Sequence, residues 1–336
     1  MSFFLSVSIF MLFGAFFPKV KQGIFILVSF LLMFYILAYR SVSVGTDTLN
    51  YETAFNNLSS GADWIRSELE FGWIFLNDVV IFFNGEFRDL LVISAALTLL
   101  PIFYVAKKYS YNPMLTILFY YLFYFYFYSF NIMRQSIAIS IIFLSLAAFL
   151  NNRIKIFLFL IFLASTFHYS AFIFIFLYLA KIGWEKKNIY LSLIVSLLFG
   201  MFGVGVFSKI IGFIGYSSYI LDYNYGNIVG NLLFLLIVNS ILFLFLLSEK
   251  NISIYIKIFF IYVVFLNFFI RVPFGARLIL YFAICQILVY PYLLRNFNTS
   301  DINLKVMAYI FIVSMAYITF FLKFGEGEIV PYLNVF

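Results

Sequence analysis

The only histidine of the chain, His168, is the first candidate for chemistry. It lies in the short polar segment Phe167–Ser170, after a long apolar run. Histidine can take a proton from an attacking hydroxyl near neutral pH, so His168 is a candidate general base. The alternative is a core histidine whose ring nitrogens are hydrogen-bonded. No cysteine or close carboxylate accompanies it along the chain, so the sequence predicts neither a metal site nor a cofactor.

Three arginines interrupt apolar runs. Arg134 stands between two of them, and Arg271 and Arg277 flank Pro273 and Gly275, which predict a helix break. An arginine in hydrocarbon costs at least about 2.5 kcal/mol, so we expect all three guanidiniums near a membrane surface. A guanidinium binds phosphate through a planar fork, so the three could hold a diphosphate. Alternatively, they extend toward lipid headgroups.

The longest polar stretch runs from Arg40 to Glu70. It combines hydroxyl, carboxylate, amide and aromatic side chains, which are the groups that hold sugar hydroxyls and ring faces. Gly45-Thr46-Asp47 lacks the spacing of a phosphate-binding loop, so the stretch is no nucleotide motif. The alternative is a solvated loop in which Gly45 makes a turn.

These residues belong to a chain whose main solvent is lipid. Of its 336 residues 65% are hydrophobic and 10% charged, whereas soluble domains carry about 25% charged residues. Apolar runs recur along the whole chain without the alternation of a membrane barrel. We therefore predict one all-α polytopic domain over residues 1–336, with about 10–12 transmembrane helices. The net charge of +7 comes from basic residues between apolar runs, so we expect a bilayer and no nucleic acid as partner.

The distribution of basic residues favours one topology. Most of the 21 Lys and Arg fall inside if Phe71–Phe83 does not cross and Ile154–Ala180 enters and leaves on the same side. Broken segments at membrane depth are tolerated only where protein or water surrounds them. We therefore expect re-entrant or broken segments around an outward-facing cavity. His168 would lie at the tip of the second segment, and residues 40–70 would form a polar periplasmic or extracellular loop.

Five motifs, taken in order over roughly residues 25–300, resemble the EpsG family of bacterial surface-polysaccharide polymerases, which are related to Wzy O-antigen polymerases. They are Arg40…Gly45-Thr46-Asp47…Tyr51, Glu70-Phe71-Gly72, Met133-Arg134-Gln135, Phe167-His168-Tyr169-Ser170 and Arg271…Arg277.

The resemblance implies a glycosyltransferase of the bacterial inner membrane, with a GT-C-like fold and an active site that faces the periplasm. It would move a growing glycan from undecaprenyl diphosphate to the terminal sugar hydroxyl of the next lipid-linked oligosaccharide unit. It would need no metal, and the family implies a separate chain-length regulator as partner.

The resemblance also gives roles to residues of this chain. The general base would be His168, with Asp47 or Glu70 as alternatives. The diphosphate would be held by Arg134, Arg271, Arg277 and Arg40. The glycan would contact Thr46, Tyr51, Gln135 and Trp64.

Three other functions remain open from the sequence. A lipid-linked oligosaccharide flippase also has about twelve helices and buried arginines. An O-antigen ligase would share the fold and the arginines. A membrane O-acyltransferase can use a lone histidine near the membrane.

Overall fold

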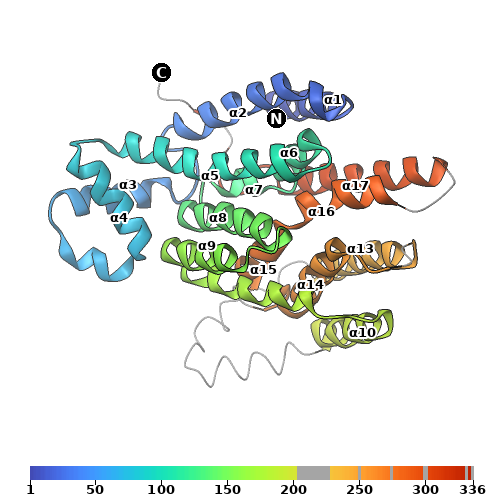
Figure 1. Cartoon of the computed structure of the whole chain (residues 1–336). Coiled ribbons are helices and arrows are strands. Elements are labelled where there is room, and N and C mark those ends of the chain that lie inside the picture. Colours follow the sequence, from blue (N-terminus) through green and yellow to red (C-terminus); the bar gives the residue numbers. More distant parts are fainter. Residues whose placement is uncertain (203–227, 249–250, 273–274, 298–301, 330–331, 334–336) are drawn as a thin grey trace. The chain divides into compact units, whose positions relative to one another are not determined.

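The computed structural model describes the chain except residues 203–227, 249–250, 273–274, 298–301, 330–331 and 334–336 (Figure 1). The described residues form helices and contain no β-strand, as the apolar runs predict. They divide into two compact units, one made of Met1–Phe172 with Met307–Phe336 and the other of Ile173–Val306. Each unit is described by itself.

The first unit contains most of the polar residues that the sequence singled out. Its helices are α1 (Ser2–Ala15), α2 (Gly23–Ala38), α3 (Thr48–Ser59), α4 (Phe71–Phe82), α5 (Phe87–Tyr109), α6 (Pro113–Leu122), α7 (Phe125–Tyr128), α8 (Met133–Leu150), α9 (Ile154–Phe167) and most of α17 (Ile302–Lys323), with the short 3-10 helices η1 (Lys19–Lys21) and η2 (Asp63–Glu68). The polar stretch from Arg40 to Glu70 is therefore largely helical.

Helix α8 lies at the centre of the first unit. It packs between α5 and α9 (Figure 1), and nearly all of its side chains are buried. Buried tyrosines in the segment before α8 donate hydrogen bonds to backbone carbonyls of neighbouring helices. Tyr121 donates to the carbonyl of Phe4 at 2.9 Å, and Tyr126 donates to that of Met33 at 2.9 Å. The start of α8, where Arg134 stands, is thus held in a well-packed core.

Among the described residues, three helices are long and apolar enough to cross a membrane. They are α5, α8 and α17; a fourth span forms if the bent pair α15–α16 counts as one. Eight further apolar helices have 10–17 residues, fewer than the roughly 20 that a perpendicular crossing needs. The chain is an all-α polytopic membrane protein. The expected total of about 10–12 crossings remains a prediction.

The two segments expected not to cross are short or broken. Helix α4 has 12 residues. The second segment divides at His168, whose extended backbone (φ −157°, ψ 112°) separates α9 from the 3-10 helix η3 (Tyr169–Lys181). The predicted break at His168 is confirmed, whereas its re-entrant path through a bilayer stays a prediction.

The second unit contains α10 (Lys186–Phe202), α13 (Ile228–Ser248), α14 (Ile254–Phe269), α15 (Gly275–Ala283) and α16 (Gln286–Asn296). Asn267 of α14 donates to Ser196 of α10 at 2.9 Å and to Asn239 of α13 at 3.1 Å, so one amide ties three helices together. The predicted break before Gly275 is present between α14 and α15. Pro273 lies outside the described residues.

Candidate functional site

The candidate site centres on the carboxylate of Glu70, the residue that precedes α4. One oxygen, Oε1, lies 3.1 Å from Nδ1 of His168 at the end of α9. The other, Oε2, accepts a hydrogen bond from Arg134 in the first turn of α8 and forms an ion pair with it. The Glu70 side chain is 7% exposed, that of Arg134 29% and that of His168 24%. The carboxylate is therefore enclosed, while its two partners reach solvent.

A glycine lets these three helix ends meet. Helix α4 packs against α9, and α9 packs against α8. At the first contact, a β-carbon on Gly72 would lie 2.6 Å from the hydroxyl of Thr166 and 2.9 Å from its carbonyl oxygen. Such distances are too short for any side chain, so glycine is required for this close approach. Because Gly72 is two residues after Glu70 and Thr166 is two before His168, the contact places the carboxylate beside the imidazole.

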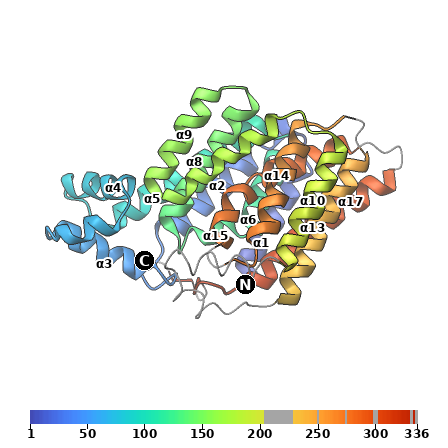
Figure 2. The same cartoon turned by 90° about the horizontal axis from the view of Figure 1, so that it is seen from below.

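Tyr51, on the first turn of α3, is the fourth member of the site. Its side chain forms a hydrogen bond with Arg134, and its ring packs edge-on against Trp73 with 5.3 Å between ring centroids. Figures 1 and 2 show α3 and α4 together beside the start of α5. Burial raises the pKa of Tyr51, and the charge of Arg134 opposes this only in part, so the phenol stays protonated near neutral pH.

The charge state of Glu70 follows from its surroundings. Burial by itself would raise the pKa of this carboxyl, but the hydrogen bond from His168 and the charge of Arg134 lower it, and the net result is a lowered pKa. Glu70 is thus ionised at neutral pH. An ionised Glu70 is an acceptor, so His168 donates its Nδ1 proton and the other ring nitrogen, Nε2, is left as an acceptor.

The loop before α3 contains two further predicted residues. Asp47 is the residue that precedes α3, and Thr46 donates to Oδ1 of Asn131 at 3.2 Å. Gly45 has φ +94°, and a β-carbon there would lie 2.7 Å from the same Asn131 oxygen. Asp47 acts on Tyr51 through its charge. In the described part of the chain, Asp47 makes no hydrogen bond or ion pair with Glu70 or His168, and these two residues form the hydrogen-bonded pair.

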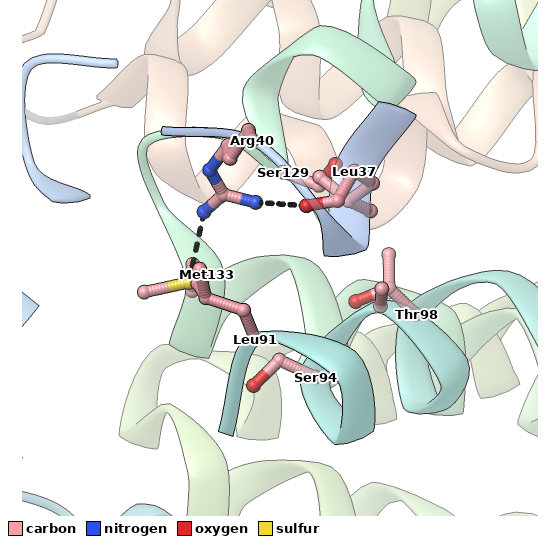
Figure 3. A pocket seen from close by; sticks show the side chains of 8 residues that line it. Leu37, Arg40, Leu91, Ser94, Thr98, Ser129 and Met133 are labelled. Atoms are coloured by element: carbon pink, nitrogen blue, oxygen red, sulfur yellow. Dashed lines mark hydrogen bonds between the residues drawn. The ribbon is translucent and has the colours of Figure 1, made fainter. Parts of the chain in front are cut away.

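Arg40 is enclosed in the first unit (Figure 3). It is 1% exposed, donates to the carbonyl of Leu37 at 2.6 Å and to Met133 Sδ at 3.2 Å, and stands over the Phe130 ring at 5.2 Å. Burial lowers its pKa to about 10, so it stays charged at neutral pH. The adjoining pocket, which Ser94 also lines, is too narrow for a water molecule. A phosphate could reach Arg40 only if this packing opened.

The remaining predicted residues are two in the first unit, Gln135 and Trp64, and two in the second, Arg271 and Arg277. Gln135 is buried next to Arg134, and Trp64 is exposed in η2. Arg271 and Arg277 belong to the second unit, where Arg271 donates to the carbonyl of Met201 at 2.8 Å and Arg277 is exposed at the start of α15. The expected outward-facing cavity also remains a prediction.

Two residues that position the site were not predicted. Thr166 makes the contact with Gly72, and Asn131 contacts the Gly45–Thr46 turn. For Thr166 the available signal was Gly72, a glycine inside an otherwise apolar segment and two residues after a carboxylate, because such a glycine often marks a close approach of two backbones.

The fold and the site together define a multi-pass membrane protein with a buried carboxylate that bridges a histidine and an arginine. Within the described residues, no three His, Cys, Asp or Glu side chains form a group that could hold a metal ion. No curated protein and no solved structure matches the chain. The model of the EpsG family matches residues 23–334, so the chain belongs to this family, whose members are Wzy-like polymerases. This membership points to a polysaccharide polymerase-type function.

Proposed function

We propose that the protein is a polysaccharide polymerase that transfers a growing glycan from a polyprenyl diphosphate to a hydroxyl of the next lipid-linked unit. The observation that carries the proposal is the Glu70 carboxylate, which bonds a histidine on one oxygen and an arginine on the other. Family membership supports the polymerase class. The outer face of the bacterial inner membrane is the side on which we place the reaction.

His168 is the general base of the proposed reaction. Glu70 accepts the proton of Nδ1, which fixes the ring and leaves Nε2 to accept the proton of the sugar hydroxyl. The ionised carboxylate also stabilises the imidazolium that forms, as an acidic residue does in a hydrolase triad. The partial exposure of His168 gives an acceptor sugar access to the ring.

Arg134 is the group that stabilises the leaving diphosphate. A guanidinium has five N–H donors, and the bonds to Glu70 and Tyr51 leave others for phosphate oxygens. A fixed positive charge is most useful where negative charge develops, which here is the diphosphate oxygen that leaves the anomeric carbon. Arg271 and Arg277 remain candidates for the same ligand.

The proposed transfer needs no reactant besides the donor glycan and the acceptor hydroxyl, with His168 and Arg134 as the catalytic groups. The acceptor oxygen forms a bond to the anomeric carbon of the donor glycan as its proton passes to Nε2 of His168. The bond between that carbon and the diphosphate oxygen breaks, and polyprenyl diphosphate leaves with the electron pair. The proton on His168 returns to solvent before the next cycle.

The test compares variants by their activity on a lipid-linked repeat unit in proteoliposomes. We expect His168→Ala to slow polymerisation by about 10²–10⁴-fold and Arg134→Ala to slow it by about 10²–10³-fold. Arg66→Ala is the matched control, because Arg66 pairs with Asp78 on the exposed surface at 2.9 Å. We expect that variant to keep full activity. Full activity of both His168→Ala and Arg134→Ala would refute the proposed site.

The same variants separate the alternative functions in cells. A polymerase variant displays single repeat units outside the cell. A flippase variant accumulates them on the cytoplasmic leaflet, and a ligase variant loses all surface attachment, single units included. Either of the last two phenotypes would contradict the polymerase assignment.

A further inference from the structure

We infer that the end of the chain is a brace that positions the active site. The C-terminal brace is Gly325–Ile329 together with Tyr332 and Leu333. Its effect on catalysis rests on the proposed function. The described residues of the brace contact the loop that precedes α3 and the segment that precedes α8. Tyr51 and Arg134 lie in the first turns of these two helices.

Backbone hydrogen bonds attach the brace to the first of these segments. Gly45 donates its N–H to the carbonyl of Glu328 at 3.1 Å, Thr46 donates to Gly327 at 3.2 Å, and Ser41 donates to Leu333 at 2.8 Å. The loop from Ser41 to Thr46 is not regular secondary structure. These bonds therefore satisfy backbone N–H groups that no helix or sheet hydrogen bond satisfies. The loop therefore has its observed path only with the brace in place.

Asn131 joins the brace to the second segment. A β-carbon on Gly327, which has φ +76°, would lie 2.1 Å from the side-chain nitrogen of Asn131. The side-chain oxygen of the same asparagine accepts a hydrogen bond from the Thr46 hydroxyl. It would also lie 2.7 Å from a β-carbon on Gly45. One amide side chain thus lies between the brace and the Gly45–Thr46 turn, three residues before Arg134.

Side chains hold the brace at both of its ends. Lys323, at the end of α17, donates to the hydroxyl of Tyr128. The hydroxyl of Tyr124 donates to the carbonyl of Glu326 at 3.2 Å, and that of Tyr332 donates to the carbonyl of Ile36 at 2.8 Å. Ile329, between these contacts, is 1% exposed. The brace is therefore docked by several independent contacts.

The path from the brace to the chemistry is short. Asp47 directly follows the braced turn, and its carbonyl accepts the N–H of Tyr51 at 3.1 Å in the first turn of α3. The Tyr51 side chain then bonds Arg134, which pairs with Glu70. Gly327 and Asn131 are positioning residues in this scheme, because they act through Tyr51 and Arg134.

The test uses two glycines of the same segment. Gly325 and Gly327 both have positive φ (+97° and +76°), so alanine strains the backbone at either. Only at Gly327 does the new carbon meet Asn131; at Gly325 no atom lies within 4 Å. In proteoliposomes we expect Gly327→Ala to lower kcat by about 10- to 100-fold, because small misplacements of reacting groups have effects of this size. Gly325→Ala should stay near the wild-type rate.

Two further variants keep the proposal testable. Adding Asn131→Ala to Gly327→Ala removes the clashing amide. The kcat of the double variant should therefore equal that of Asn131→Ala alone and exceed that of Gly327→Ala. If Gly327→Ala does not accumulate in the membrane, Tyr332→Phe decides, since it removes only one hydroxyl of the brace. We expect that variant to lower kcat by about 2- to 10-fold at an unchanged protein level.

Several results would overturn the brace. The first is equal kcat values for Gly325→Ala and Gly327→Ala, and the second is a double variant no faster than Gly327→Ala alone. The third is a rise in kcat in Tyr332→Phe, which would show that the segment inhibits the enzyme. Failure of the proposed function looks different. In that case His168→Ala and Arg134→Ala are fully active, whatever the glycine variants do.

Discussion

At the scale of single residues, the site depends on one carboxylate that serves two partners. Glu70 has two oxygens, and each bonds a different side chain, His168 or Arg134. Neutral glutamine has the same shape but supplies one acceptor and no charge. Replacing Glu70 by glutamine would therefore loosen the imidazole and leave the guanidinium without its counter-ion, two effects that no single change at either partner combines.

The lowered pKa of Glu70 predicts how stability depends on pH. A carboxyl whose pKa is lower in the folded state stabilises the fold fully above its unfolded value, about 4.3, and loses this contribution as the pH falls through the lowered pKa. We therefore expect wild-type protein in detergent to have a higher Tm than Glu70→Gln at neutral pH. The difference should persist to about pH 4 and shrink below it.

The control for the pH experiment is Glu68→Gln, because Glu68 is an exposed carboxylate two residues away. We expect its Tm to follow that of the wild type throughout. A Tm difference between wild type and Glu70→Gln that widened in acid would contradict the direction of the Glu70 shift.

At the scale of elements, the site is made by the ends of three helices. Glu70 precedes α4, His168 follows α9 and Arg134 lies in the first turn of α8. Helix ends carry backbone groups that the helix itself does not satisfy, so polar side chains gather there. Each of these ends needs its neighbour at a fixed distance, and the contact of Gly72 with Thr166 sets that distance for α4 and α9.

Gly72→Ala tests whether this contact positions the site. The added carbon would meet the Thr166 backbone as well as its hydroxyl, so the helices must separate. We expect a loss of about 1–3 kcal/mol in stability, the usual cost of overpacking, together with a large loss of polymerisation. Thermal unfolding and product chain length measure the two effects.

Gly23→Ala is the matched control, because Gly23 also lies in the first turn of a helix but has no atom within 4 Å of its would-be β-carbon. It should leave both measurements unchanged. Normal product length in Gly72→Ala would show that the α4–α9 contact does not position the site.

At the scale of the whole molecule, the proposed function requires that the site face the side on which lipid-linked units would be displayed. The 23-residue helix α5 can cross the bilayer and carries Lys107 and Lys108 in its last turn. Basic residues at a helix end favour the cytoplasmic side. The opposite end of α5, with η2 and α4 before it, is then expected outside.

Thiol labelling in intact cells tests this orientation. The natural cysteine, Cys285, is buried, so the unmodified protein supplies a low background. We expect a membrane-impermeant thiol reagent to label Trp64→Cys in intact cells, since Trp64 is 62% exposed. Lys107→Cys should react only after the membrane is permeabilised. The reverse pattern would invert the topology and place His168 on the cytoplasmic side.

The sequence by itself determined the solvent, the fold class and the family. With 65% hydrophobic residues, the chain has too little polar surface for any fold except helices in lipid. Arg134 and His168 could be singled out because ionisable groups are rare among apolar runs and each one costs energy there. Tyr51 and Glu70 were singled out by the polar stretch and by the family resemblance. The break at His168 was also predicted, from the distribution of basic residues between the two sides of the membrane.

Only the tertiary structure decided how these residues are combined. Glu70, which the family resemblance gave as an alternative base, bridges the imidazole and the guanidinium, while Tyr51 bonds Arg134 and Arg40 is enclosed. These pairs join residues 64 to 98 positions apart in the chain. The meeting of Glu70 with His168 depends on the close approach of Gly72 to the backbone of Thr166. Hydrophobic periodicity fixes which segments are helices, but side-chain packing decides which helix ends meet.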